Sequence, residues 1–211
     1  MDKIRKLKSC RVCDSNNLTK DLIIKNMPFT DEFLYKKDFG KEFLEDIEIY
    51  TCNKCSLVQT LKDVQVSKYY LDYQYSVGGS QIANSFMKNL ALNINKEYFK
   101  NKKNKSILEI GSGDGCQLNE FKKLKFNVTG CEPSKSLSKI ATKRKIKTIN
   151  SMFTSNTIKV LEKSKKFDVI LLSYTFDHLQ DPRKFLKNIK NILKNDGLLV
   201  IEVHDLDKIF K

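Results

Sequence analysis

The sequence lacks any long apolar run, contains no tryptophan, and has only two histidines among its 211 residues. No stretch approaches the roughly 18 consecutive apolar residues that a membrane-spanning helix needs. Residues 1–8 are charged and no apolar segment follows them, so they lack the pattern of a secretory signal peptide. These absences predict a cytoplasmic protein with no membrane partner.

Arginine is scarce, although the chain is strongly basic. Only four of the 39 basic residues are arginine, the others are lysine, and the formal net charge is +14. Arginine is the residue favoured for bidentate contacts with phosphates and base edges, so nucleic acid is a disfavoured partner. A lysine- and asparagine-rich composition is typical of codon bias and a solvated surface. A selected anionic partner, such as RNA, is the alternative.

Four of the six cysteines stand in two C-x-x-C pairs, Cys10/Cys13 and Cys52/Cys55. In a cytosolic chain this pattern favours a metal over a disulfide. Zn²⁺ takes four tetrahedral ligands, and each pair supplies two thiolates from one tight turn, so the sequence predicts a closed, structural zinc site. A disulfide or redox pair is the weaker alternative. The long gap between the two pairs implies an inserted lobe that includes residues 27–35.

The chain is expected to fall into three segments: a zinc-binding lobe over 1–66, an aromatic and helical connector over 67–104, and a core over 105–211. The polar run at residues 100–105 marks the second boundary. The connector contains apolar residues four positions apart, which predict a helix that packs on a core. These residues are Ile82, Phe86, Leu90, Ile94 and Tyr98.

From residue 106 onward, short apolar segments alternate with helical patterns. Strands are expected at 106–110, 127–132, 147–150, 167–173 and 198–204, and helices at 116–123, 134–145, 156–164 and 182–194. The Asn-Asp-Gly at residues 195–197 is expected to end the last helix. The strand at 167–173 is apolar throughout, as in a sheet covered on both faces. This alternation predicts an α/β fold with a parallel, doubly wound sheet.

A glycine-rich segment follows the first of these strands and comprises Glu109, Gly111, Ser112, Gly113, Asp114 and Gly115. Its glycines permit a tight turn and a close approach of a ligand to the backbone. The second strand ends in Glu132, an acid that can accept hydrogen bonds from both hydroxyls of a ribose. Dinucleotide-binding folds share these features. The E-x-G-x-G-x-G pattern, however, resembles motif I of class I methyltransferases and favours S-adenosylmethionine (SAM).

The fourth strand continues as SYTFDHLQDP, followed by a helix, an LKNDG segment and another strand. This order is typical of small-molecule methyltransferases. Phe153 and Ser173 follow the third and fourth strands, so both are candidates for lining the cofactor site. Ordinary loop packing is an equally weighted alternative for each of them.

The motifs together resemble the nucleotide-sugar C-methyltransferases over nearly the whole chain. They run in the order CRVC, CNKCSLVQT, YYLDYQYSVGGS, EIGSGDG, GCEPS, HLQDP and VIEVHDL. The resemblance implies methyl transfer from SAM to a sugar ring carbon beside a keto group, in surface-polysaccharide or antibiotic sugar pathways. It also implies that the four cysteines bind zinc, that 109–115 with Glu132 and Pro133 hold SAM, and that Tyr75 faces the active site.

The sequence departs from this family in two small ways, at Gly113 and near Cys116, and in one large way, at its C-terminal end. Family members usually have asparagine where Gly113 stands, a change that leaves SAM binding intact. They also continue further, with a Tyr-x-Glu-His segment that supplies the catalytic base, whereas this sequence stops at Lys211. The resemblance therefore implies a fragment, a shortened homologue or a member with other chemistry. We expect poor C-methylation by this chain alone, with the open sheet edge pairing with a second copy or covered by a partner.

The two histidines, His178 and His204, lie at or just past the carboxyl ends of the fourth and fifth expected strands. Ligands bind at those ends in open α/β sheets, so both are candidates for the base that C-methylation requires. For His178 the alternative is a residue that only ties loops together. Two other functions stay open, a zinc-containing RNA methyltransferase and a non-catalytic fragment that binds SAM or a partner.

Overall fold

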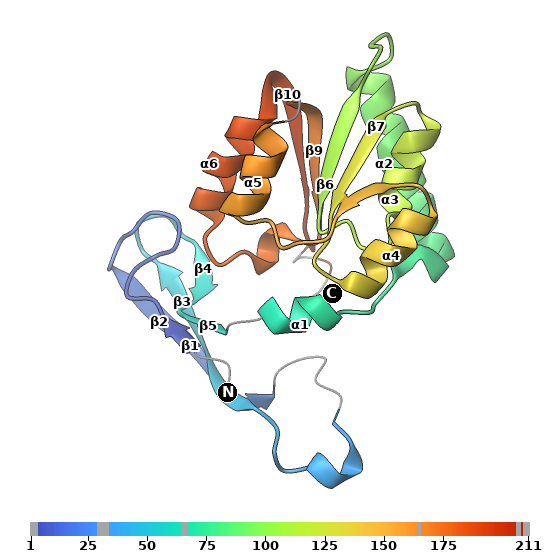
Figure 1. The fold of residues 1–211 in the computed structure, drawn as a ribbon. Helices are drawn as coiled ribbons and strands as arrows, with labels where there is room; N and C mark the ends of the chain where they lie inside the picture. Colours follow the sequence, from blue (N-terminus) through green and yellow to red (C-terminus); the bar gives the residue numbers. More distant parts are fainter. Residues whose placement is uncertain (1–3, 29–33, 65–66, 164–165, 206–207, 209–211) are drawn as a thin grey trace. The chain divides into compact units, whose positions relative to one another are not determined.

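The computed structural model describes residues 4–28, 34–64, 67–163, 166–205 and 208. It divides into two compact units, unit 1 at Met1–Val66 and unit 2 at Ser67–Lys211 (Figure 1). No helix among the described residues is both long and apolar enough to cross a membrane.

Unit 1 contains two small antiparallel sheets. One pairs β1 (Ile4–Lys6) with β5 (Lys62–Val64), and the other joins β2 (Leu18–Pro28), β3 (Leu44–Cys52) and β4 (Val58–Thr60) in that order. The connection from β2 to β3 contains a 3-10 turn, η1 (Lys36–Asp38). Of the expected insertion at residues 27–35, residues 29–33 lie outside the described part of the chain. The cysteine pairs thus flank a hairpin that the sequence patterns did not predict.

Unit 2 is an α/β domain that begins with two helices, α1 and α2. Its elements in chain order are α1 (Ser67–Asp72), η2 (Val77–Gly79), α2 (Gln81–Tyr98), β6 (Ser106–Ile110), α3 (Cys116–Lys123), β7 (Asn127–Cys131), α4 (Lys135–Lys143), β8 (Lys147–Ile149), α5 (Ser155–Glu162), β9 (Phe167–Ser173), η3 (Phe176–His178), α6 (Pro182–Ile192) and β10 (Leu193–Glu202).

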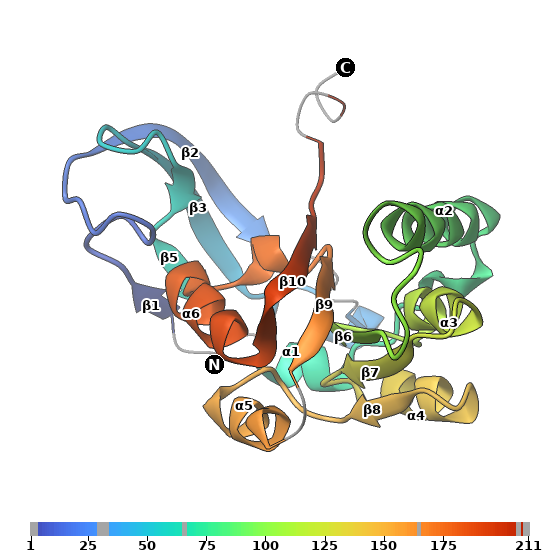
Figure 2. The same ribbon diagram turned by 90° about the horizontal axis from the view of Figure 1, so that it is seen from above.

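The five strands of unit 2 form one parallel sheet in the order β10-β9-β6-β7-β8. Helices α2, α3 and α4 cover one face of this sheet and α5 and α6 cover the other (Figure 2). The predicted doubly wound sheet is therefore confirmed. Because the chain leaves β6 and β9 in opposite directions, the switch point where such folds bind ligands lies at the carboxyl ends of these neighbouring strands. We call this side of the sheet the carboxyl edge and the opposite side the amino edge.

Helix α2 was predicted, but its buried face was not. Ile82 is 85% exposed, and Phe86 and Tyr98 are also exposed, whereas Ala91 and Ile94 are buried. Residues four apart advance by about 400° around a helix, so each step drifts by about 40°. Five such positions turn through about 160° and cannot share one face. The expectation that the whole stripe packs on the core is therefore wrong.

Helix α6 ends at Ile192 and β10 begins at Leu193, so the prediction that residues 195–197 end the helix is wrong. Strand β10 pairs with β9 at Leu193 and again from Leu198 onward, with an irregular bulge between them. The chain leaves the helix early because Leu193 packs into the core beside α5 and α6. The next side chain, Lys194, also places its Nζ 2.8 Å from a buried carboxylate on β9.

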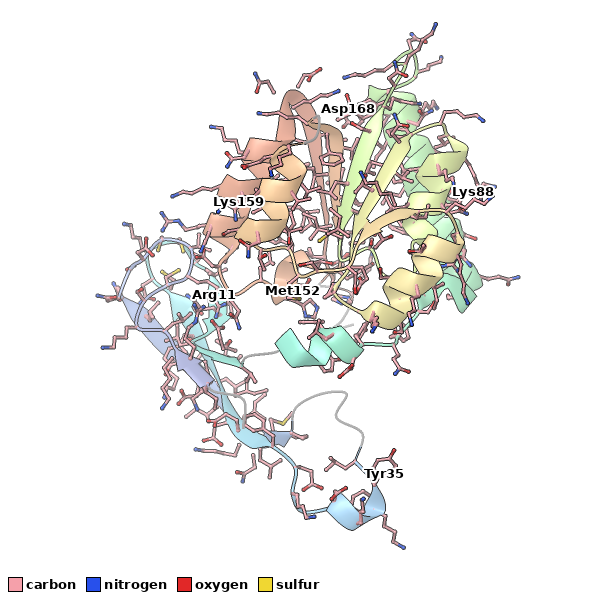
Figure 3. All side chains as sticks on the ribbon, in the orientation of Figure 1. Arg11, Tyr35, Lys88, Met152, Lys159 and Asp168 are labelled. Atoms are coloured by element: carbon pink, nitrogen blue, oxygen red, sulfur yellow. The ribbon has the colours of Figure 1, made fainter. Side chains whose placement is uncertain are left out.

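That carboxylate is Asp168, which is fully buried at the amino edge (Figure 3). It accepts hydrogen bonds from the Ser106 backbone N–H at 2.9 Å and hydroxyl at 2.7 Å, and it also pairs with Lys102 Nζ at 2.9 Å. Burial alone would raise the pKa of Asp168, but these donors and the two ammonium groups hold it below the ordinary aspartate value. The cluster ties the loop after α2 to β6, β9 and β10.

Candidate functional site

The loop after β6 turns at glycines whose backbone lies in the left-handed region. Gly111 has φ +75° and Gly113 has φ +51°. A Cβ atom at Gly111 would collide with the Thr175 side chain, whereas nothing lies within 4 Å of a Cβ placed at Gly113. The Gly111 N–H donates to the Cys131 carbonyl at 2.9 Å, which fixes the loop to β7. The loop is therefore held firmly at its start and open beside Gly113, where a ligand can approach the backbone.

Glu132 follows β7 and lies against this loop. Its two carboxylate oxygens accept hydrogen bonds from the Gly113 N–H at 2.8 Å and the Ser134 N–H at 2.7 Å. Burial raises the pKa of Glu132, and the two backbone donors partly offset that effect. Each carboxylate oxygen keeps a further lone pair. The predicted ribose acid is thus adjacent to the glycine loop and can still accept hydrogen bonds.

Several buried oxygen atoms at the carboxyl edge have no hydrogen-bond partner among the described residues: Glu109 Oε2, Ser112 Oγ, Ser173 Oγ and Glu202 Oε1. An unsatisfied buried polar group costs about 1–3 kcal/mol. Such atoms gathered at the switch point of a doubly wound sheet indicate a site that a polar ligand completes. Together with the open space beside Gly113, they show that the residues present fit SAM.

A segment before α2, residues 73–78, contacts the glycine loop and the start of α4, and we call it the strap. The Tyr73 carbonyl accepts a hydrogen bond from Ser134 Oγ at 2.6 Å. The Ser76 hydroxyl donates to Asp114 Oδ2. The strap is therefore fixed to the two chain segments that contain the glycine loop and the predicted ribose acid.

Asp114, a predicted cofactor residue, makes several contacts within the protein. Its Oδ1 accepts from the Cys116 N–H at 3.0 Å at the start of α3, and its Oδ2 lies 3.2 Å from Arg144 Nη1. Burial would raise its pKa, but the Ser76 hydroxyl, the Cys116 N–H and the Arg144 guanidinium lower it. The carboxylate thus stays ionised and holds α3, the strap and the end of α4 together.

Each histidine lies beside a tyrosine at the carboxyl edge. His178, in η3, has Nδ1 2.9 Å from the Tyr70 hydroxyl of α1. His204, just past β10, has its ring centroid 4.8 Å from that of Tyr174. Tyr174 adopts φ +50° directly after β9, and its N–H donates to the Glu202 carbonyl at 2.9 Å. The hydrogen bond to β10 thus holds a non-glycine residue in the left-handed region, which such residues adopt infrequently.

Three other predicted residues lie around these groups. Tyr75, within the strap, is 67% exposed. Phe153 packs against Phe185 of α6, with ring centroids 5.1 Å apart, so its visible contact is ordinary core packing. The carbonyl of Pro133 accepts a hydrogen bond from the Asn150 side chain at 2.9 Å.

In unit 1 the two C-x-x-C pairs form matching turns. The Cys10 N–H donates to the carbonyl of the fifth residue beyond it, at 2.9 Å, and the Cys52 N–H does the same. Each turn ends in a residue with positive φ, Asp14 at +58° and Ser56 at +60°. The two pairs therefore present their thiols through the same backbone geometry.

The four sulfur atoms lie within 4.8 Å of one another. The distance from Cys10 Sγ to Cys55 Sγ is 3.6 Å, and that from Cys13 Sγ to Cys52 Sγ is 3.5 Å. Sulfurs bound at about 2.3 Å to a tetrahedral zinc ion would be about 3.8 Å apart. Although burial opposes ionisation, backbone amides and neighbouring side chains lower the pKa of Cys10 to about 6. The cluster fits a closed Zn²⁺ site.

Sequence patterns did not identify Tyr70, Ser76, Arg144, Tyr174 or Glu202. Tyr70 and Ser76 belong to the quoted aromatic motif, and Tyr174 stands between the fourth strand and the HLQDP turn. Their position in these motifs was a usable signal. Glu202 likewise belongs to the quoted VIEVHDL motif. Arg144 carried no such signal, because its contact with Asp114 joins distant parts of the chain.

Comparison with known families gives two matches. A family model described as "Methyltransferase domain" matches residues 83–209, and a model described as "Putative zinc binding domain" matches residues 10–70. The first covers more than half of the chain and contains the glycine loop, Glu132 and both histidines. The second contains all four clustered cysteines.

Two of the curated relatives that this chain is similar to are methyltransferases by name. The chain is 24% identical to the C-methyltransferase NovU of Streptomyces niveus over 214 residues, which cover 100% of this chain and 50% of that protein. It is 29% identical to the ubiquinone biosynthesis O-methyltransferase of Coxiella burnetii over 99 residues, 46% of this chain and 42% of that one. The chain therefore spans about half the length of the curated relatives it matches.

Solved structures share the fold. The PH0226 protein from Pyrococcus horikoshii matches with a TM-score of 0.52 at 20% identity, over 68% of this chain and 64% of that chain. The plantazolicin methyltransferase BpumL, solved with S-adenosylhomocysteine (SAH) and a substrate analogue, matches with a TM-score of 0.50 at 23% identity, over 63% and 51%. The chain belongs to the methyltransferase-domain family and has the class I SAM-binding fold, and its N-terminal part is a four-cysteine zinc-binding module.

Proposed function

We propose that this protein transfers a methyl group from SAM to a ring carbon of a nucleotide-linked keto-sugar, in surface-polysaccharide or antibiotic sugar biosynthesis. The observation that carries the proposal is the similarity to a C-methyltransferase along the entire chain. That similarity covers the cysteine module and the SAM-binding domain together, whereas the match to the O-methyltransferase covers less than half of the chain.

When bound, SAM supplies a methyl group activated by its sulfonium charge. The protein's own residues must then align the acceptor carbon, exclude water and remove the proton beside the ketone. The base first takes the proton from the acceptor carbon and leaves an enolate. The enolate carbon then forms its bond to the methyl group while the bond from that methyl group to sulfur breaks, and SAH is the other product. We assign the proton transfer to the histidines of the carboxyl edge.

His178 and His204 are the candidates for this role, each with a tyrosine beside it. The Tyr70 hydroxyl orients His178, because it lies 2.9 Å from Nδ1. The Tyr174 ring packs against His204. Histidine is the side chain that most often acts as a positioned general base or acid.

The test combines methyl transfer with proton exchange. Nucleoside diphosphate keto-sugars are incubated with SAM, and methylation is read by mass spectrometry. In a second arm, SAH replaces SAM in D2O, and loss of the proton beside the ketone is followed by NMR. Turnover by this chain alone is expected to be slow, and replacing the histidine that acts as the base, in His178→Asn or His204→Asn, should slow both processes further by about 10²- to 10⁴-fold, with unchanged SAH affinity as the control. Tight SAM binding with no turnover would instead support the non-catalytic function.

The charge of +14 keeps RNA as a second candidate substrate. Against it, Arg5 and Arg11 both pair with Asp63 in unit 1, and Arg144 pairs with Asp114. These guanidinium groups are engaged in ion pairs within the chain. Weak retention on heparin with a shallow salt dependence is the expected result. A steep loss of RNA affinity with rising salt would favour the RNA methyltransferase.

A further inference from the structure

Glu202, at the carboxyl end of β10, shares one face of the sheet with Glu109 and Ser173. Strand pairing aligns Glu202 with Ser173, and it aligns Glu109 with Leu171, two residues earlier in β9. Paired residues of neighbouring strands point to the same face, and so do residues two apart in one strand. The three side chains therefore project together from β6, β9 and β10 at the carboxyl edge, and we call them the acid recess.

The acid recess is buried and incomplete. Glu109 is only 3% exposed. Its Oε2, Ser173 Oγ and Glu202 Oε1 are buried acceptors without hydrogen-bond partners in the part of the chain that the structure describes. Buried acceptors are nearly always paired in folded proteins. Three unpaired acceptors on one face indicate a ligand with several donors.

The charge around the recess is negative. Burial first, and then the charges of Glu202, Asp114 and Glu132, raise the pKa of Glu109 well above the ordinary glutamate value. Arg144 is paired with Asp114, and among the described residues no lysine or arginine pairs with Glu109 or Glu202. A cationic ligand would relieve this repulsion, whereas a carboxylate or phosphate would add to it.

The chemistry of the cofactor limits what can occupy the recess. Its ribose hydroxyls are expected at Glu132, and its carboxylate would be repelled by the negative charge of the carboxylates around the recess. Its sulfonium carries charge but no N–H donor. Its α-ammonium group carries both a positive charge and three N–H donors, which match three unpaired acceptors. We propose that Glu202 is a cofactor-binding residue that forms, with Glu109 and Ser173, the pocket for the α-ammonium group.

A proton leaves when the pocket fills. In the free protein, burial and the neighbouring carboxylates raise the pKa of Glu109 and so favour its protonated form. The arriving ammonium ion favours the carboxylate form, so the Glu109 proton is released to solvent while the ligand stays protonated. Binding of a ligand with the ammonium group should therefore release protons, and binding of a ligand without it should not.

The test uses calorimetry on the intact chain with two ligands. SAH has the amino-acid end and 5′-methylthioadenosine lacks it. We expect Glu202→Gln to weaken SAH binding about 10-fold or more, because a charge-assisted hydrogen bond is lost, and to leave 5′-methylthioadenosine binding within about twofold. Glu162→Gln, at the exposed end of α5, is the matched control and should change neither affinity.

Two further readouts separate ligand binding from a structural role. Without ligand at pH 8, Glu202→Gln should unfold at the same temperature or a higher one, because it removes a repulsive charge. In the unaltered protein, SAH titrations in buffers of different ionisation enthalpy should show proton release, and titrations with 5′-methylthioadenosine should show none. Equal weakening of both ligands, unchanged SAH affinity, a lowered unfolding temperature or absent proton release would each overturn the proposal. No methyl acceptor is present, so these results are independent of the proposed sugar substrate.

Discussion

Asp168 is a buried carboxylate whose ion pairs stabilise the amino edge of the sheet. Replacing it with asparagine leaves the ammonium groups of Lys102 and Lys194 without their shared partner. Breaking a buried ion pair typically costs 3–5 kcal/mol, but both lysines are about one-third exposed, so we expect Asp168→Asn to lower the free energy of unfolding by about 2 kcal/mol. Urea denaturation measures this change.

The same experiment has a pH dependence of known sign. Because the pKa of Asp168 is lowered in the folded state, its stabilisation is present above the pKa of the unfolded chain and is lost as the pH falls. The difference between the two proteins should therefore be largest near neutral pH and shrink in acid. Asp196→Asn is the control, since Asp196 also faces Lys102 but is 75% exposed. If Asp196→Asn lowered the free energy of unfolding as much as Asp168→Asn does, this account would be contradicted.

Two glycines of the cofactor loop should respond differently to substitution. Gly113→Asn places a residue that tolerates the left-handed region where nothing lies within 4 Å of a Cβ. We expect unchanged thermal stability and SAM affinity. Gly111→Ala meets the Thr175 side chain as well as an unfavourable φ, which alone costs about 1–2 kcal/mol. Thermal unfolding and calorimetry distinguish the two. Equal damage by both would show that Gly113 is needed for close ligand approach.

Glu132 is the predicted partner of the cofactor's ribose. We expect Glu132→Ala to weaken SAM binding by about 1.5–3 kcal/mol for each charge-assisted hydrogen bond lost. The Gly113 and Ser134 N–H groups also lose their acceptor. The resulting change in the loop should weaken SAM binding further. Calorimetry measures the affinity, with Glu97→Ala on the exposed side of α2 as the control. Unchanged SAM affinity would remove Glu132 from this role.

The paired cysteine turns should make unit 1 dependent on metal. We expect one zinc ion per chain, and Cys52→Ser should reduce the zinc content to near zero because a closed site needs all four ligands. Elemental analysis of protein purified without chelator measures this. Cys116→Ser is the control, because Cys116 lies in unit 2. Because the SAM-binding residues also lie in unit 2, SAM affinity should survive zinc loss. Its disappearance would contradict this independence.

The strands and helices of unit 2 were predictable because short apolar runs and the glycine loop mark them directly. The hairpin of unit 1 was not, because β2 is exposed at most positions and shows no apolar alternation. The end of α6 was misplaced for a different reason. Lys194 lies in β10 and pairs with Asp168, which lies 26 residues earlier in the chain. No local sequence pattern predicts such a contact.

The candidate site divides in the same way. The glycine loop, Glu132 and the cysteine pairs are defined by spacing, and the structure brings each group together as expected. The Tyr70 contact with His178 joins residues 108 positions apart, and Arg144 meets Asp114 across 30 positions. These contacts exist only after the sheet has assembled, so a single sequence cannot show them. The roles of His178 and His204 stay predictions.

Strand β10 borders the sheet, and among the described residues its only strand partner is β9. An unpaired strand edge can pair with another chain. We expect concentration-dependent self-association, measured by size-exclusion chromatography with light scattering. Ile201→Lys places a charge on the border strand β10 and should reduce this self-association. Val160→Lys, at an exposed apolar position on α5, should not. A monomer at every concentration would contradict the expectation.

The Asp168 cluster and the glycine loop lie at opposite ends of the same strands, and this separation bears on how the protein can evolve. The ion pairs of Asp168 stabilise the sheet at the amino edge, while the residues that we propose for cofactor binding and proton transfer lie at the carboxyl edge. Substitutions that change the preferred methyl acceptor can therefore accumulate at exposed positions of the carboxyl edge, such as Tyr75 in the strap, with little loss of stability. Acceptor specificity should drift faster among descendants of this protein than the residues around Asp168.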